Sequence, residues 1–306
     1  MPLRRLRPGD TVGVAALSGP ADPADLARGC AALEAMGYRV RLAANAGLRK
    51  GLLGLAGSEA ERLAGYRALL ADPDVAAILF ARGGYGATPL LSLLDPAEMA
   101  AHAKIHCGFS DLTAISARLF ARCNLPSFHG PMVAADLARG LDPLSAEFFP
   151  AMLEGRGPAE LALPGADVLV PGDAEGRLVG GCLSLLAAMV GTRDEFPYDG
   201  SILLVEEVAE EAYRVDRMLV TLRDAGRLAK LRGILIGSLS AVTFGGAEDP
   251  ARLRALLVER LSPLGIPVVA GLPVGHRGPN VTLPIGARVA WSLSRHALEF
   301  RERIVA

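Results

Sequence analysis

The chain has 306 residues, enough to bury the core of one large domain or of two smaller ones. Hydrophobic residues make up 51% and charged residues 21%, which fits a folded protein and excludes a disordered one. The formal net charge is -1, and the only basic run is the short RRLR at residues 4–7, so the basic stripe of a nucleic-acid-binding protein is missing. We therefore expect a small molecule as the partner.

The cysteines and the apolar runs indicate the compartment. Cys30, Cys107, Cys123 and Cys182 form no close CxxC pair, which is typical of reduced thiols in a cytosolic protein. A positively charged start is interrupted by Pro8-Gly9-Asp10, and no stretch reaches the roughly 18 apolar residues of a membrane helix. We expect a cytoplasmic protein that does not enter a membrane.

The first half alternates strands and helices. Strands are expected at residues 10–17, 39–45, 75–80, 104–107 and 125–129, and helices at 22–38, 58–72 and 112–122. Ser58 and Glu61 have the spacing of a capping box at the start of the second helix. This alternation predicts an α/β fold with a mostly parallel sheet covered on both faces.

Two loops fall at the carboxyl edge of this sheet, where ligands bind in such folds. They are ARGGYGA at residues 81–87 and GFSD at residues 108–111. Ser110 and Asp111 stand where a strand passes into a helix, so either could be a helix cap. Alternatively, Ser110 is a nucleophile displayed on a turn. Cys107 lies inside the strand and is expected to be a small core residue.

The pattern loosens between about residues 137 and 173 and then returns. Strands are expected at 177–181, 200–208, 231–240 and 266–276, helices at 182–192, 212–226 and 249–265, and an antiparallel hairpin at 281–302. We therefore divide the chain into an N-terminal α/β domain (1–140), a linker with edge structure (141–172) and a smaller C-terminal mixed α+β domain (173–306).

Two features near the ends of predicted strands suggest chemistry. The glycine turn at residues 83–86 lacks the spacing of a phosphate-binding loop, but its exposed N–H groups suit an oxyanion hole, and Arg82 beside it could pair with a substrate carboxylate or a buried acid. Glu206 and Glu207 end a buried strand, where adjacent residues point to opposite faces, so one is expected at the sheet edge and the other in solvent. A carboxylate there could orient a histidine, or both could simply be solvated.

Histidines are few, and none is spaced like a metal cluster. His102 and His106 are four residues apart but straddle a change from helix to strand and lack a third ligand, so no metal site is expected. His276 differs because it follows a strand end within GLPVGHRGPN, among glycines and prolines. It is either a structural residue or a base.

Six sequence blocks follow one another along nearly the whole chain. They are LAGSEAERL with LLADPDVAAILFARGGYGA, GFSDLTAI, HGPM, GRLVGGCLSLLAAMVGT, LLVEEVAEEAYRVDRML and GLPVGHRGPNVTLPIG. In this order they resemble the LD-carboxypeptidase family of serine peptidases. The resemblance implies a Rossmann-like N-terminal layer, a smaller C-terminal domain of mixed β structure and an active site in the cleft between them.

The same resemblance implies the site residues. Ser110 would be the nucleophile, Glu206 the acid and His276 the base, with backbone N–H groups of Gly84 and Asp111 as oxyanion donors. The Asp111 side chain would at the same time cap the following helix.

Two positions depart from the family pattern. Glu207 stands where relatives often have Asp, and Arg277 stands where a small residue is more usual. Arg277 and Arg82 are the candidates for binding a substrate carboxylate.

The implied reaction is release of the terminal D-alanine from cytoplasmic muropeptide tetrapeptides during peptidoglycan recycling, without cofactor or metal. We expect a homodimer that acts on a small peptide. A sister branch of the family hydrolyses microcin C-type toxins and is the alternative. A non-catalytic ligand-binding α/β protein is a third possibility, which the complete Ser110, Glu206 and His276 set disfavours.

Overall fold

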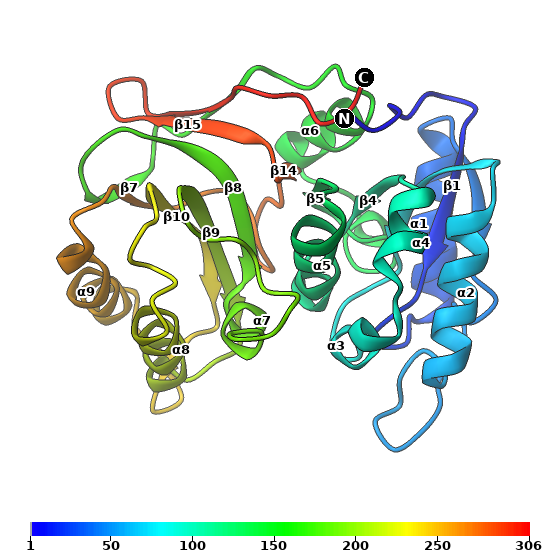
Figure 1. Ribbon diagram of the computed structural model, residues 1–306, viewed down its shortest axis with the longest axis horizontal. Coiled ribbons are helices and arrows are strands. Elements are labelled where there is room, and N and C mark those ends of the chain that lie inside the picture. The colour runs from blue at the N-terminus through cyan, green and yellow to red at the C-terminus, as the bar shows by residue number, and fades with distance from the viewer. Residues whose placement is uncertain (1) are drawn as a thin grey trace. The chain divides into compact units, whose positions relative to one another are not determined.

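The computed structural model describes residues 2–306, which form two compact units (Figure 1). The first unit contains the chain up to Gly157 together with Val281–Pro284 and Arg303–Ala306, and the second contains Pro158–Asn280 and Ile285–Glu302. Neither unit is a single continuous stretch of chain. The domain boundaries drawn from the sequence, 1–140 and 173–306, stay a prediction.

The first unit is built on a six-stranded sheet with the order β2-β1-β3-β4-β5-β14. The strands are β1 (Thr11–Ala15), β2 (Arg39–Leu42), β3 (Val75–Phe80), β4 (Ile105–Cys107), β5 (Ser127–His129) and β14 (Leu283–Ile285). The pairs β1–β2, β1–β3, β3–β4 and β4–β5 are parallel. Every residue of β1 and β3 is buried, as expected for strands covered on both faces. The predicted α/β class is confirmed.

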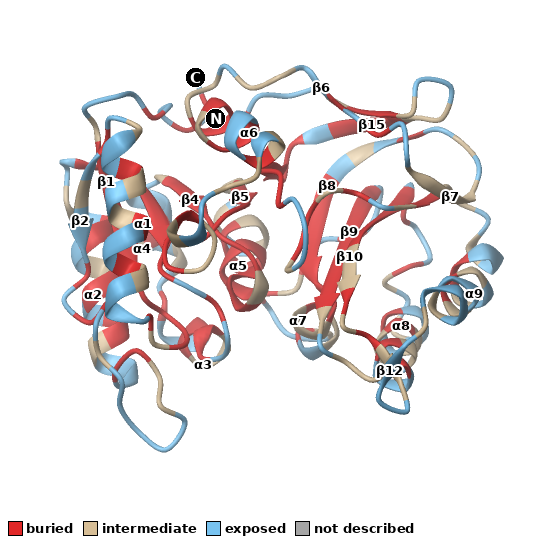
Figure 2. Ribbon diagram, turned by 180° about the vertical axis from the view of Figure 1, so that it is seen from behind, coloured by how far each residue is buried: buried red, intermediate tan, exposed pale blue. Residues whose placement is uncertain are grey.

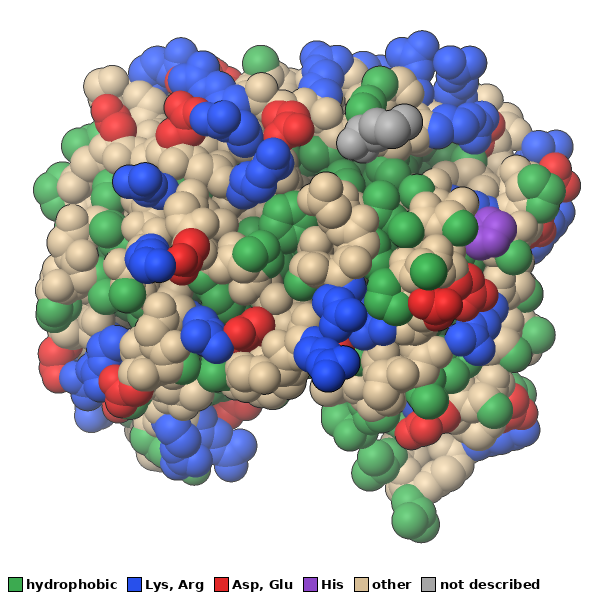
Figure 3. All heavy atoms as spheres, in the orientation of Figure 1, with side chains coloured by type: hydrophobic (Ala, Val, Ile, Leu, Met, Phe, Trp, Pro, Cys, Tyr) green, Lys and Arg blue, Asp and Glu red, His purple; other side chains and the backbone are tan. Residues whose placement is uncertain are grey.

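Helices connect these strands. They are α1 (Pro23–Ala35), α2 (Glu59–Ala71), α3 (Ala87–Leu90), α4 (Pro96–Ala101), α5 (Thr113–Cys123) and α6 (Pro143–Leu153), with short 3-10 turns η1 (Leu91–Leu93), η2 (Ser110–Leu112) and η3 (Leu137–Arg139). The capping box at α2 is confirmed, because Ser58 Oγ accepts from the Glu61 N–H and the Glu61 carboxylate accepts from the Ser58 N–H. Between β2 and α2 a loop projects outward, and in Figure 3 hydrophobic side chains form its tip, where Leu52 and Leu53 are exposed.

The second unit contains an eight-stranded mixed sheet with the order β6-β16-β15-β8-β9-β10-β13-β7. The strands are β6 (Glu160–Ala162), β7 (Asp167–Val170), β8 (Ala174–Cys182), β9 (Ser201–Val208), β10 (Gly233–Ser240), β13 (Val268–Ala270), β15 (Arg288–Ser292) and β16 (Ala297–Phe300). The central strands β8, β9, β10 and β13 are parallel, and the outer pairs are antiparallel. The predicted mixed C-terminal domain and its terminal hairpin, β15–β16, are confirmed. The segment 141–172, interpreted above as a linker with edge structure, carries α6 and the edge strands β6 and β7.

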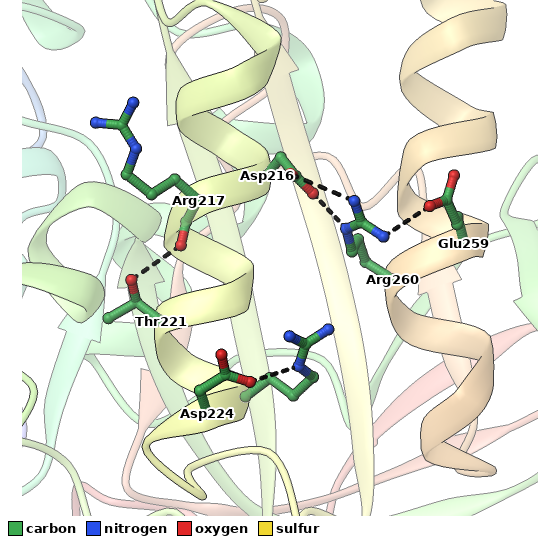
Figure 4. A network of polar contacts seen from close by, with 7 residues as sticks. Asp216, Arg217, Thr221, Asp224, Glu259 and Arg260 are labelled. Carbon is green, nitrogen blue, oxygen red and sulfur yellow. Dashed lines mark hydrogen bonds and ion pairs between the residues drawn. The ribbon is translucent and has the colours of Figure 1, made fainter.

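The remaining elements of this unit are helices α7 (Leu183–Ala188), α8 (Ala212–Asp224) and α9 (Pro250–Leu261), the turn η4 (Ser262–Leu264), and a small hairpin of β11 (Thr243–Phe244) and β12 (Ala247–Glu248). In Figure 2 the central strands are largely buried, whereas the outer face of α9 is exposed. Arg260 on α9 pairs with Asp216 on α8 and with Glu259 on its own helix (Figure 4). This contact ties the two covering helices together.

Topology places three loops of the first unit at one edge of its sheet. Strand β2 lies on one side of β1 and β3 on the other, so the direction in which strands are added to the sheet reverses at β1. Ligands bind at such a switch point, outside the carboxyl ends of the strands. The loops that follow β1, β3 and β4 all start there. Among residues 2–306, no helix is both long and apolar enough to cross a membrane.

Candidate active site

Ser110 lies on a strained corner between β4 and α5. Its φ is +61°, in the left-handed region that residues other than glycine rarely adopt, and its neighbours Phe109 and Asp111 are buried whereas Ser110 is only half-buried. A serine held in such a turn between a strand and a helix is the arrangement of a nucleophile elbow. Strain of this kind costs on the order of 1–3 kcal/mol and persists only where the surroundings impose it.

The surroundings of this corner include the Asp111 carboxylate, which is 1% exposed. Its Oδ2 accepts hydrogen bonds from Ser18 Oγ (2.5 Å) and from the backbone N–H of Ala87 (2.8 Å). Ala87 is the first residue of α3, and α5 has no side-chain cap. The expectation that Asp111 caps the following helix is therefore wrong: its side chain reaches the turn after β3 instead. Burial raises the pKa of Asp111, while these hydrogen bonds and the charge of Arg62 oppose the rise.

The glycine turn after β3 packs directly against Ser110. An ideal Cβ on Gly83 would lie 2.9 Å from the Ser110 Cβ, 3.0 Å from its Oγ and 3.4 Å from the Asp111 nitrogen. Gly84, the next residue, has φ +109°. A side chain at Gly83 would displace Ser110, so glycine lets the turn approach the Ser110 hydroxyl closely.

Arg82 precedes this turn and is exposed. Its Nη1 donates to the carbonyl oxygen of Pro20, 3.2 Å away, in the loop that follows β1. That acceptor is a neutral carbonyl, so the bond does not neutralise the guanidinium.

In the second unit, Glu206 and His276 form a hydrogen-bonded pair. His276 Nδ1 lies 2.8 Å from Glu206 Oε2, the Glu206 side chain has no exposed surface, and the His276 side chain is 19% exposed. Burial raises the pKa of Glu206, and the hydrogen bond and charge of His276 lower it. A proton on Nδ1, donated to the carboxylate, fixes the tautomer in which Nε2 is the basic nitrogen.

Glu207 has different hydrogen-bond partners from Glu206. The sequence analysis expected at least one of these two side chains to lie in solvent, but both are buried. Glu207 is 3% exposed, its Oε2 accepts from the Ser184 N–H (2.7 Å) and its Oε1 accepts from the Val208 N–H (2.8 Å). Ser184 lies in the first turn of α7. Glu207 therefore satisfies one backbone donor at the start of α7 and one on its own strand β9.

The loop that carries His276 is braced from within. Asn280 is 4% exposed, and its Oδ1 accepts from the Gly275 N–H at 3.2 Å. Gly275 has φ +122°, and an ideal Cβ there would lie 3.2 Å from Glu206 Oε2. Arg277 points to a different partner, since its Nη1 lies 3.3 Å from the Glu248 carboxylate on β12, and both side chains are exposed.

Several of these residues were not predicted from the sequence. Ser18 lies outside every motif that we recognised. Arg62 lies inside the LAGSEAERL block, Gly83 inside the glycine turn and Asn280 inside the GLPVGHRGPN block, but none of the three was itself assigned a role. His106 is a structural residue, because its Nε2 lies 2.9 Å from the Tyr66 hydroxyl. No three His, Cys, Asp or Glu side chains within residues 2–306 gather so as to hold a metal ion.

Comparison with known proteins identifies the class. Residues 12–130 match the LD-carboxypeptidase N-terminal domain and residues 175–290 match the LD-carboxypeptidase C-terminal domain. A probable murein peptide carboxypeptidase of Bacillus subtilis (strain 168) is 36% identical over 94% of this chain and 90% of its own length. The crystal structure of a muramoyltetrapeptide carboxypeptidase from Oxalobacter formigenes matches with a TM-score of 0.81 and 31% identity, covering 95% of this chain and 99% of the other.

The microcin C7 self-immunity protein MccF, in its wild-type apo state, matches with a TM-score of 0.90 over 100% of both chains. Its identity to this chain is 24%, so this likeness shows the shared fold alone. The two family models and the relatives above 30% identity define a serine peptidase, and hence a hydrolase. The chain belongs to the LD-carboxypeptidase family.

Proposed function

We propose that this protein is a serine-type L,D-carboxypeptidase that releases the terminal D-alanine from muropeptide tetrapeptides in peptidoglycan recycling. The observation that carries the proposal is the 2.8 Å hydrogen bond between His276 Nδ1 and the fully buried Glu206 carboxylate. Such a pair is the base and acid of a catalytic triad, and Ser110 is the nucleophile that the proposal adds to it.

The proposed reaction is acyl transfer. Ser110 Oγ attacks the carbonyl carbon of the terminal amide while His276 Nε2 accepts its proton, and Glu206 stabilises the imidazolium. The oxyanion receives hydrogen bonds from the Asp111 and Gly84 N–H groups. Collapse breaks the C–N bond, the imidazolium protonates the departing amine of D-alanine, and water then hydrolyses the ester.

Recognition of the free terminal carboxylate is assigned to Arg82 and Arg277. A carboxypeptidase needs a charged donor there, because a charge-assisted hydrogen bond is about twice as strong as a neutral one. The Arg82 guanidinium contacts a neutral carbonyl and is available for this purpose. Arg277 would have to exchange its exposed contact with Glu248 for the substrate, and exposed ion pairs of this kind are weak, roughly 0–1 kcal/mol.

The murein assignment is supported by relatives above 30% identity that carry murein or muramoyltetrapeptide carboxypeptidase names. Hydrolysis of a microcin C-type toxin is the alternative, and its support is a likeness of fold. Cytoplasmic location is also part of the proposal and is supported by four cysteines that are free thiols. A homodimer is proposed as well, and sedimentation analysis of the purified protein tests it.

A side-by-side assay of two substrates decides the function. We expect release of D-alanine from a murein tetrapeptide, and poor cleavage of analogues that are amidated at the C-terminus or end in L-alanine. Removing the carboxylate loses the charge-assisted hydrogen bond to the arginine, and inverting the centre moves the carboxylate away from it. Faster turnover of an aminoacyl-sulfamoyl nucleotide would replace the murein assignment by the toxin assignment. Turnover of neither compound would favour a binding protein.

A further inference from the structure

A buried arginine lies beneath the glycine turn that packs against Ser110. Arg62, on α2, is 1% exposed. Its Nη1 donates to the carbonyl oxygens of Gly86 (2.5 Å) and Leu17. Gly86 closes the turn after β3, and Leu17 lies in the loop after β1. One guanidinium nitrogen therefore joins the two loops that flank the sheet's switch point.

Other hydrogen bonds join the same two loops at different atoms. The Gly19 N–H donates to the Gly83 carbonyl oxygen (3.1 Å). Asp111 accepts from Ser18 in one loop and from Ala87 just beyond the other. The loops are thus held between a buried cation on one side and a buried carboxylate on the other.

This arrangement is a costly way to stabilise a fold. Removing an arginine from water is unfavourable unless its donors are satisfied, and Arg62 Nε has no hydrogen-bond partner among the described residues. Burial lowers the pKa of Arg62, while the negative charges of Glu59 and Asp111 raise it. The guanidinium also leaves no room for a side chain at Gly86, because an ideal Cβ there would lie 2.8 Å from Arg62 Nη1.

We propose that Arg62 is a positioning residue of the serine site, which fixes the glycine turn so that its amides lie beside Ser110 and the Asp111 N–H. Arg62 contacts neither substrate nor the reacting atoms. Its effect passes through the Gly86 carbonyl to the turn that begins at Gly83. Since oxyanion donors act on the transition state, loss of their alignment lowers kcat and leaves ground-state binding unchanged.

The test compares Arg62→Met and Arg62→Lys with a matched control, Arg118→Met. Arg118 on α5 is also buried, at 6% exposed, and donates to the Leu94 carbonyl. We expect Arg62→Met to lower kcat about 100-fold, the order found when one oxyanion donor is lost, with KM within about 3-fold. Arg62→Lys, which keeps the charge, should recover at least about 10-fold of that loss. Arg118→Met should keep kcat within about 3-fold.

Folding is controlled in the same experiment. Each variant is also made in a Ser110→Ala background, and tetrapeptide binding is measured by calorimetry together with Tm. Unchanged stoichiometry and Kd for Arg62→Met alongside the lost kcat would support positioning. Equal kcat losses in the Arg62 and Arg118 variants, or a lower binding stoichiometry, would reduce Arg62 to a structural role.

The inference rests on the proposed function, and the two fail differently. If Ser110→Ala keeps full turnover of both substrates, the serine mechanism itself is wrong. If Ser110→Ala is inactive while Arg62→Met retains wild-type kcat, the mechanism stands and the role of Arg62 is refuted.

Discussion

At Ser110 the backbone conformation and the proposed chemistry are coupled. A left-handed φ turns the side chain out of the strand direction, and buried neighbours hold it there. Glu206 and Glu207 are adjacent on β9 but have different partners. Glu206 binds His276, whereas Glu207 accepts a hydrogen bond from the backbone at the start of α7. Because neighbouring residues have different roles, a substitution at one of them can be controlled by the same substitution at the next.

Replacement of Ser110 gives two distinguishable results. Ser110→Ala and Ser110→Gly should both lose at least ~10³-fold in turnover, because members of a triad act as a unit. Their stabilities should differ, since alanine keeps the left-handed strain that glycine avoids, about 1–2 kcal/mol. Chemical denaturation measures this difference. Equal stability of the two variants would contradict the strained corner, and residual activity near wild type would contradict the nucleophile.

The adjacent glutamates should respond in opposite ways. Glu206→Gln should lower kcat by about 10²–10⁴-fold, because the amide no longer stabilises an imidazolium at Nδ1. Glu207→Gln should instead lower stability by about 1–3 kcal/mol, since an amide replaces a carboxylate that serves buried backbone donors. Steady-state kinetics and thermal melting on both variants check this. A large kcat loss confined to Glu207→Gln would exchange their roles.

At the scale of elements, helix α2 links the fold to the serine site. It begins at the capping box of Ser58 and Glu61, and Arg62 follows at the next position. Hydrogen bonds from Lys50 and Ser58 lower the pKa of Glu61 to about 2. Its contribution is therefore present above the ordinary glutamate pKa of about 4.5 and is lost as pH falls towards 2.

The lowered pKa of Glu61 gives a prediction about how stability depends on pH. The stability difference between the wild type and Glu61→Gln should be constant above pH ~5 and shrink as the pH falls below ~4.5, because Glu61 of the unfolded chain then takes up a proton that the folded protein, with its lowered pKa, does not yet bind. Denaturation of both proteins from pH 3 to 7 measures it. A difference that grows on acidification would show that Glu61 is not stabilised as an anion.

Elements with strong local signals were predictable from the sequence, and contacts between distant segments were not. Buried apolar runs gave β3 and β9, and the Ser58–Glu61 spacing gave the start of α2. The strand β14 was read as part of a terminal hairpin, because nothing within residues 283–285 indicates that they pair with the first sheet. The partner of Asp111 was missed for the same reason, since Ala87 is distant in sequence. Ser110, Glu206 and His276 were proposed because they lie in recognisable motifs. The proposed role of Arg62 depends on its contacts with two distant loops, which no local pattern indicates.

For the whole molecule, the first sheet depends on the end of the chain. Its edge strand β14 comes after the first segment of the second unit, which ends at Asn280, and the terminal segments meet at a bridge between Leu3 and Val305. We expect a fragment of residues 1–157 to be less stable than the same fragment joined by a flexible linker to residues 281–306. The fragment without β14 has an open β5 edge, which favours aggregation. Light scattering and circular dichroism on the two chains test this, and equal behaviour would show that β14 is dispensable.

The late position of β14 in the sequence affects folding during synthesis. The chain leaves the ribosome from its N-terminus, so β5 emerges with one side of its hydrogen-bonding ladder open. The strand that covers it follows roughly 150 residues later, which at ordinary translation rates is on the order of ten seconds. During that interval the serine corner already exists as sequence, but the sheet that imposes its strained geometry is incomplete. We therefore expect the nascent chain to be most prone to aggregation in the interval between synthesis of β5 and synthesis of β14.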